Sequence, residues 1–139
     1  MLFPKKVKHR KWQTQRKSQK RLSRPDTRGT TVVFGSFALK ALTSARVTSN
    51  QIESARKVLA RATAKTGKLW IRIFPDRPVT AKPAEVGMGS GKGDPKFYVF
   101  EVRPGRVLFE LDGVPEDIAR AHLRQAGMKL PVTTSIITR

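Results

Sequence analysis

The sequence contains no cysteine, only two histidines, and far fewer acidic than basic residues. Without cysteine the chain can form neither a disulfide nor a thiolate metal site, which fits a reducing compartment. His9 and His122 lie far apart, so the sequence indicates neither a zinc site nor a histidine-activated nucleophile. No apolar run approaches the roughly 20 residues needed to cross a bilayer, and a basic block stands where a secretory signal would be apolar. These absences argue against an enzyme and predict no metal and no cofactor.

Positive charge is what the sequence has in excess. Its 139 residues include 29 Lys and Arg against 10 Asp and Glu, a formal net charge of +19. Self-repulsion of this size opposes compaction, so the needs of folding do not explain it. A polyanionic partner does, with nucleic acid as the first candidate and an anionic membrane surface as the second. The length fits one domain with a modest core.

About half of this charge lies in residues 1–29, where eleven basic residues stand against Asp26 alone. Apolar residues are few there and follow no helical or strand period, so we expect an extended basic arm that orders on an anionic surface. A merely solvated tail is the alternative. Trp12 would either stack on a base or pin the arm to the body. The basic residues of the arm are Lys5, Lys6, Lys8, Arg10, Lys11, Arg16, Lys17, Lys20, Arg21, Arg24 and Arg28.

A second unusual stretch runs from Pro75 to Pro95, between apolar runs at 69–74 and 97–100 that indicate strands. Its many prolines and glycines disfavour helix and sheet, so we predict a long loop without secondary structure, anchored in a sheet at both ends. Loops of roughly 20 residues are rare in compact domains and are usually functional or disordered. We interpret this one as a basic finger that lies against a partner. Its basic residues are Arg77, Lys82 and Lys92.

The glycine-rich part of the finger, residues 87–93, does not match the known nucleotide-binding motifs. A P-loop needs glycine five residues before Gly91 and serine or threonine after Lys92, but Val86 and Gly93 stand there. The dinucleotide fingerprint fails as well. The finger also leads into a predicted strand, so no helix N-terminus is available to hold a phosphate. A nucleotide-using enzyme is therefore disfavoured.

Two helices are predicted. A capping box, Thr48-x-x-Gln51, opens the first, and Gly67 is its natural stop. Its polar face carries Lys57 and Arg61, which would face either solvent or phosphate. The expected buried positions are Ile52, Ala55, Val58, Leu59 and Ala62.

The second helix begins near Pro115 and ends at Gly127. Its expected buried side consists of Ile118, Ala119, Leu123 and Ala126, and His122 is expected to be partly buried and structural. Further strands are expected at residues 31–39 with an interruption at Gly35, and at 97–102, 107–111 and 132–137.

These elements predict an α+β fold over residues 30–139, a mostly antiparallel sheet with both helices on one face. Pro104-Gly105 suits a type II turn, so residues 97–102 and 107–111 should form a hairpin. The other face of the sheet, including Trp70, Arg72 or Tyr98, would be open to a partner. Since no zinc-finger, zipper or RNP-like motif is visible, the charge favours many phosphate contacts on a folded RNA and little reading of bases.

A series of motifs runs in order along nearly the whole chain. It comprises Met1-Leu2-x-Pro4-Lys5 with Lys8-x-Arg10-Lys11, Phe34-Gly35-x-Phe37, Gln51-Ile52-Glu53-x-Ala55-Arg56, Gly67-Lys68-x-Trp70-Ile71-Arg72-Ile73-Phe74-Pro75-Asp76-Arg77-Pro78, Thr80-x-Lys82-Pro83, Met88-Gly89-Ser90-Gly91-Lys92-Gly93, Pro104-Gly105-Arg106-Val107-Leu108-x-Glu110 and Lys129-Leu130-Pro131. The series resembles the universal large-subunit ribosomal protein sixteen family in its bacterial form. One departure is Gly87, where members of that family often carry an arginine that is hydroxylated in some bacteria.

The resemblance implies a structural constituent of the large ribosomal subunit that binds 23S-type ribosomal RNA beside neighbouring ribosomal proteins, with no membrane partner and no small-molecule substrate. It implies a cytoplasmic ribosome, with an organellar one as the alternative. It also implies a role in late subunit assembly and in organising the A-site side of the tRNA-binding cleft.

The residues implied to bind ribosomal RNA are the eleven basic residues of the arm together with Trp12, Lys57, Arg61 and Arg72. Those implied to lie near the tRNA acceptor ends at the A and P sites and the peptidyl transferase centre are Arg77, Lys82, Met88, Gly89, Gly91 and Lys92. A free-standing RNA or DNA chaperone remains the alternative.

Overall fold

The computed structural model describes residues 1–13, 20 and 23–139. In this part of the chain the elements are β1 (Phe37–Ala41), β2 (Ala45–Thr48), α2 (Ser49–Ala62), β3 (Lys68–Ile71), β4 (Arg77–Ala81), β5 (Asp94–Val102), β6 (Val107–Asp112), α3 (Glu116–Gly127) and β7 (Thr134–Thr138). Every strand pair among them is antiparallel. The predicted α+β class is confirmed.

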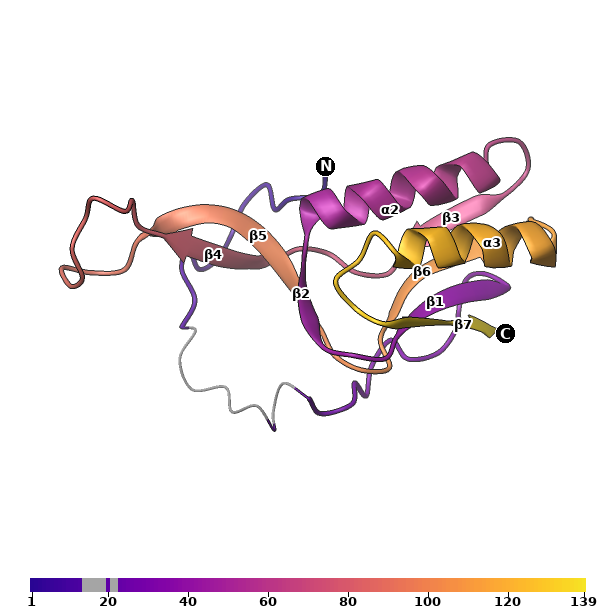
Figure 1. Ribbon diagram of the computed structural model, residues 1–139, viewed down its shortest axis with the longest axis horizontal. Helices are drawn as coiled ribbons and strands as arrows, with labels where there is room; N and C mark the ends of the chain where they lie inside the picture. The colour runs from indigo at the N-terminus through magenta and orange to yellow at the C-terminus, as the bar shows by residue number, and fades with distance from the viewer. Residues whose placement is uncertain (14–19, 21–22) are drawn as a thin grey trace.

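The described strands form two sheets where the sequence predicted one. The four-stranded sheet has the order β3-β6-β1-β7 and the three-stranded sheet the order β2-β5-β4. Figure 1 shows α2 and α3 side by side over the four-stranded sheet, while β4 and β5 extend away from this body. The apolar faces of the two helices and the inner face of the sheet make one continuous core.

The predicted hairpin between residues 97–102 and 107–111 is wrong, although its turn is present. Gly105 has φ 93°, and the amide of Arg106 donates to the carbonyl of Arg103 at 3.2 Å. The turn carries the chain from one sheet to the other, because β6 already has β1 and β3 as its neighbours. β5 pairs instead with β4 and with β2, a strand that the sequence analysis did not predict.

The first helix begins as predicted, with the Thr48 side chain accepting from the Gln51 amide and the Gln51 side chain accepting from the Thr48 amide. It ends at Ala62, before the predicted stop at Gly67. Gly67 has a different role, since a Cβ there would lie 2.8 Å from the Val114 side chain. The buried residues of α2 are Ile52, Ala55 and Leu59.

In α3 the predicted core residues Ala119, Leu123 and Ala126 are fully buried, whereas Ile118 is 41% exposed. The prediction for Ile118 was wrong because the buried stripe starts one residue later and continues at helical spacing to Gly127. His122 is half-buried as predicted, and its Nδ1 lies 2.9 Å from the carbonyl oxygen of Ile118.

The expected strand at 31–34 is absent, and β1 begins only at Phe37. The chain before β1, residues 26–36, which we call the strap, instead binds the Glu110 side chain of β6. Because Phe109 and Leu111 on either side of Glu110 belong to the core shared with the helices, Glu110 and the strap lie on the opposite, outer face of the four-stranded sheet. The Asp26 amide donates to the Pro104 carbonyl and the Val107 amide to the Gly29 carbonyl, at 2.8 and 2.9 Å. This face was expected to be open to a partner; the strap covers part of it.

Candidate nucleic-acid interface

Strands β4 and β5 form a hairpin that projects from the body (Figure 1). Its paired residues run from Arg77 opposite Val99 to Ala81 opposite Asp94. The prediction of a structureless loop over residues 75–95 was therefore too long, and the loop proper is residues 82–93, which we call the tip. Pro78 is compatible with β4 because β4 is the edge strand of its sheet and need not donate outward.

The tip has an unusually open backbone. Gly89 and Gly91 have φ of 94° and 98°, which glycine adopts without strain, and Ser90 between them also has a positive φ, 56°. A Cβ added at Gly87, Gly89 or Gly91 would meet nothing within 4 Å. Met88 is fully exposed at this point, and the Lys82 ammonium donates to the Gly89 carbonyl from within the tip. Backbone and side chains of the tip are thus accessible to a partner.

The N-terminal arm lies against the base of the tip. The Lys11 ammonium donates to the Lys92 carbonyl at 2.9 Å, and the Lys92 ammonium donates in return to the Trp12 carbonyl. Asp94 Oδ1 lies 3.3 Å from Arg10 Nη2 and 3.7 Å from Lys11 Nζ. We call this set of contacts the clasp. It joins the arm and the finger, which the sequence suggested as two separate projections, into one cationic surface.

Arg77 lies at the base of the hairpin and not at its tip. It is 2% exposed, and its guanidinium pairs with the Glu101 carboxylate, which also lies 3.6 Å from Arg46 Nε. The Arg77 guanidinium carbon lies 5.7 Å from the centre of the Trp12 ring. Trp12 therefore pins the arm to the hairpin, one of the two roles considered for it.

The other predicted RNA-binding residues fall into three groups. Arg72 is largely buried, with a side chain 17% exposed and paired with Glu110. Arg16, Lys17 and Arg21 lie outside the described residues. The exposed residues are Lys5, Lys6, Lys8, Arg10, Lys20, Arg24, Arg28, Lys57 and Arg61.

Two charged residues that the sequence analysis did not single out organise the region where the strap meets the body. Arg106 donates to the carbonyls of Arg28 and Arg72 at 3.1 and 3.3 Å, and it lies 3.7 Å from the Asp26 carboxylate. Glu110 is fully buried. A carboxylate within an otherwise apolar strand was a usable signal, because buried acids need partners.

Among the described residues, no helix combines the length and the apolar composition that a membrane span requires. The described features define a class of protein. It is a small basic α+β protein in which a hairpin projects from the body and a cationic N-terminal arm is bound to that hairpin. The family model described as "Ribosomal protein L16p/L10e" matches residues 4–137.

Curated relatives agree with the family model. Two proteins named "Large ribosomal subunit protein uL16", from two strains of Leptospira biflexa serovar Patoc, are each 54% identical over 139 residues, covering 100% of this chain and 98% of the relative. The chain therefore belongs to the ribosomal protein L16p/L10e family, which confirms the resemblance drawn from its motifs. It is a structural component of the large ribosomal subunit and not an enzyme.

Proposed function

We propose that this chain binds 23S-type ribosomal RNA through its arm and hairpin, and that the tip lies beside the tRNA acceptor ends on the A-site side of the tRNA-binding cleft, near the peptidyl transferase centre. In this proposal the arm comprises residues 1–29 and the body residues 30–139. A contribution to late subunit assembly follows, because RNA helices that meet the arm and the hairpin would be held in one arrangement.

The observation that carries the proposal is the clasp. Residues 1–13 contain five Lys and Arg and no acidic residue, and the clasp fixes them beside a tip whose backbone is accessible. A folded RNA offers closely spaced phosphates that such a surface can neutralise, with release of their counterions. Because Asp94 is 79% exposed at its side chain, its ion pairs are weak in water and phosphates can replace it.

The tip is suited to contacts that phosphates alone do not make. Met88 is apolar, flexible and fully exposed at the end of the hairpin, and the neighbouring glycines let a nucleic-acid backbone approach closely. Lys82 and Lys92 both donate to carbonyls of the hairpin or the arm. We infer that these two lysines shape the tip as well as contribute charge.

Binding of the purified chain to large-subunit ribosomal RNA at several salt concentrations tests the RNA contacts. Deleting residues 1–13 should weaken binding and lower the slope of log affinity against log salt by roughly 0.7–0.9 for each phosphate that the arm no longer neutralises. The control is Lys129→Gln, which removes the charge of one exposed lysine beyond α3 and should leave the slope nearly as it is. An unchanged slope for the deletion would rule out phosphate binding by residues 1–13.

The position of the tip can be tested in assembled ribosomes. Since the chain has no cysteine, Met88→Cys creates a single site for a photo-activated cross-linker. We expect cross-links to ribosomal RNA and to the acceptor end of bound tRNA. Cross-links to ribosomal RNA without any to tRNA would refute the placement of the tip, and recovery of the protein only outside ribosomes would favour a free chaperone.

A further inference from the structure

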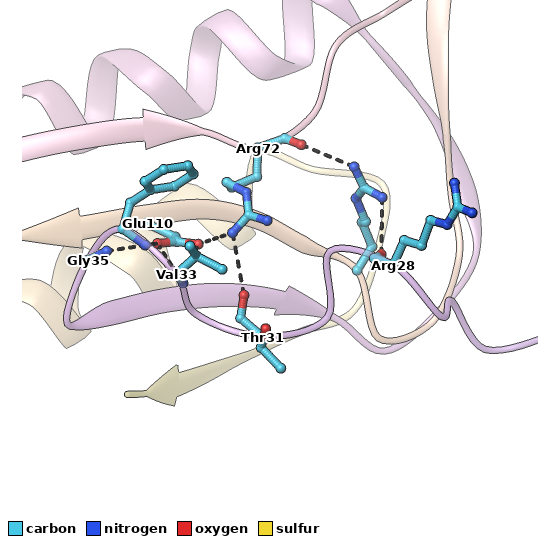
Figure 2. A network of polar contacts seen from close by, with 8 residues as sticks. Arg28, Thr31, Val33, Gly35, Arg72 and Glu110 are labelled. Atoms are coloured by element: carbon cyan, nitrogen blue, oxygen red, sulfur yellow. Dashed lines mark hydrogen bonds and ion pairs between the residues drawn. The ribbon is translucent and has the colours of Figure 1, made fainter.

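One buried carboxylate holds the middle of the strap, residues 33–35, to the body. Glu110 accepts hydrogen bonds from the amides of Val33, Phe34 and Gly35, with closest distances of 3.2, 2.7 and 2.8 Å. The Arg72 guanidinium pairs with the same carboxylate and also donates to the Thr31 carbonyl at 3.4 Å. Figure 2 shows these groups converging on Glu110 from the strap and from the end of β3. Three successive amides on one carboxylate fix the strap backbone.

The backbone at this point has little freedom to move. A Cβ on Gly35 would lie 2.4 Å from the Leu111 carbonyl oxygen, so the strap approaches β6 more closely than another residue would allow. The Ser36 amide donates to that same carbonyl at 2.9 Å. The direction of the neighbouring Phe34 side chain is therefore set by a backbone that is fixed on both sides.

Phe34 packs on the sheet but remains half-exposed. Its ring lies nearly parallel to Trp70, with ring centres 6.0 Å apart and planes 18° apart, and the Arg72 guanidinium carbon lies 5.3 Å from its centre. Trp70 and Arg72 are two residues apart, which places them on the same side of the sheet. Despite these two contacts, Phe34 is 52% exposed.

Cations lie at both ends of the strap. Arg28 is exposed on the strap, and its carbonyl is held by Arg106. At the other end of the strap, the amide of the exposed Arg139 donates to the Ser36 carbonyl at 3.0 Å. An RNA strand that follows the strap past Phe34 would therefore have a cation available at each end. Such surroundings favour a partner that carries phosphates.

We propose that Phe34 is a stacking platform for one unpaired nucleobase of RNA. Trp70 and Arg72 contact its ring, and Glu110 fixes the backbone that sets the direction of its side chain. This proposal rests on the ribosomal RNA binding proposed above. Proteins that recognise unpaired RNA commonly stack its bases on aromatic rings and on arginine planes. A ring held rigidly before binding loses little conformational freedom when the base arrives, which makes the contact more favourable.

The test compares the full chain with its Phe34→Ala variant, bound to large-subunit ribosomal RNA and probed with reagents that modify unpaired bases. Stacking contributes about 1–3 kcal/mol per base, so affinity should fall roughly 5- to 150-fold, and one unpaired base should become reactive. The salt slope should not change, because no phosphate-binding cation is removed. Phe34→Trp should retain binding and protection.

Two controls separate stacking from folding and from the wider proposal. Val33→Ala alters the other exposed apolar residue of the strap and should leave the protection unchanged, while Phe34→Leu keeps apolar cover for the sheet and should still expose the base. Failure of the unaltered chain to bind the RNA would overturn the proposed function. Normal binding with every protection retained in Phe34→Ala would overturn only the platform, as would a contact of Phe34 with a ribosomal protein.

Discussion

The strap and the clasp both attach the N-terminal part of the chain to later strands, and both use a carboxylate that pairs with an arginine, Glu110 with Arg72 and Asp94 with Arg10. They differ in exposure. Glu110, the residue of β6 that binds the strap, is fully buried. The side chain of Asp94, which binds the arm in the clasp, is 79% exposed. The same chemistry therefore serves two purposes, since burial makes one attachment part of the fold and exposure leaves the other open to exchange.

The physical reason is the cost of leaving charges unpaired. A buried carboxylate whose partners are removed has neither water nor ligands around it, so it holds its partners tightly. An exposed carboxylate exchanges its cations for water at little cost. A protein that gives up ion pairs to bind RNA can do so in the clasp without unfolding its body. Removing each carboxylate in turn measures how much each attachment contributes to the stability of the fold.

Glu110→Gln should have the largest effect. It leaves Arg72 without its counter-charge and places an amide among backbone donors, so we expect a loss of about 3–5 kcal/mol in the free energy of unfolding. The matched control is Glu116→Gln, which removes an exposed carboxylate 2.7 Å from Arg120 on α3 and should cost under about 1 kcal/mol. Urea unfolding measures both. Equal losses of unfolding free energy would mean that the buried Glu110 contributes no more to stability than an exposed carboxylate does.

The pH dependence of the free energy of unfolding should reveal the contribution of Glu110. Burial tends to raise the pKa of Glu110, but hydrogen bonds from Gly35, Phe34 and Val33 and from the Arg72 guanidinium outweigh it and lower that pKa below its ordinary value of 4.5. A lowered pKa stabilises the folded chain fully above the ordinary value, and this contribution is lost as the pH falls through the folded pKa.

The difference in unfolding free energy between the unaltered chain and Glu110→Gln should therefore be constant from pH 7 to about pH 5 and shrink in more acidic solution. The difference is the useful quantity, because Glu53 and Asp112 also have lowered pKa values and change the stability of both proteins alike. Urea titrations between pH 7 and pH 3 measure it. A difference that grows as the solution becomes more acidic would contradict the sign.

Local signals in the sequence were sufficient for several elements. The capping box located the start of α2, and helical spacing found Leu59 and Leu123 in the core. The Pro104-Gly105 turn was also correct as a turn. These features depend on residues close together in the chain, whose patterns are set by backbone geometry and capping.

The errors came from partners distant in sequence. The turn after Val102 leads to β6, whose neighbours are β1 and β3, and no local pattern reveals which strands pair. Residues 31–34 have the composition of a strand, yet the amides of Val33 and Phe34 bind a side chain more than 75 residues away. Arg77 was assigned to the exposed finger because of its charge, and only the tertiary structure shows its pairing with Glu101. The net charge indicated a polyanionic partner, but it did not indicate which basic side chains are exposed and can contact that partner.

The smallest effect on stability is expected for Asp94→Asn. Arg10 and Lys11 lose an exposed partner, which should cost at most about 1 kcal/mol in unfolding free energy. The arm should nevertheless loosen, because these ion pairs hold it beside the hairpin. In a Trp70→Phe background Trp12 is the only tryptophan, so its fluorescence quenching by acrylamide reports the arm.

Quenching of Trp12 should increase in Asp94→Asn, and salt near 1 M should reproduce that increase in the parent protein, since the Debye length falls from about 10 Å at 0.1 M to about 3 Å at 1 M, the length of these exposed ion pairs. Glu85→Gln, which removes an exposed carboxylate of the tip that lies outside the clasp, should leave the quenching unchanged. Should Asp94→Asn unfold the chain as readily as Glu110→Gln does, the clasp would belong to the core of the fold. It could not then exchange its cations for phosphates, and the distinction between the two attachments would fail.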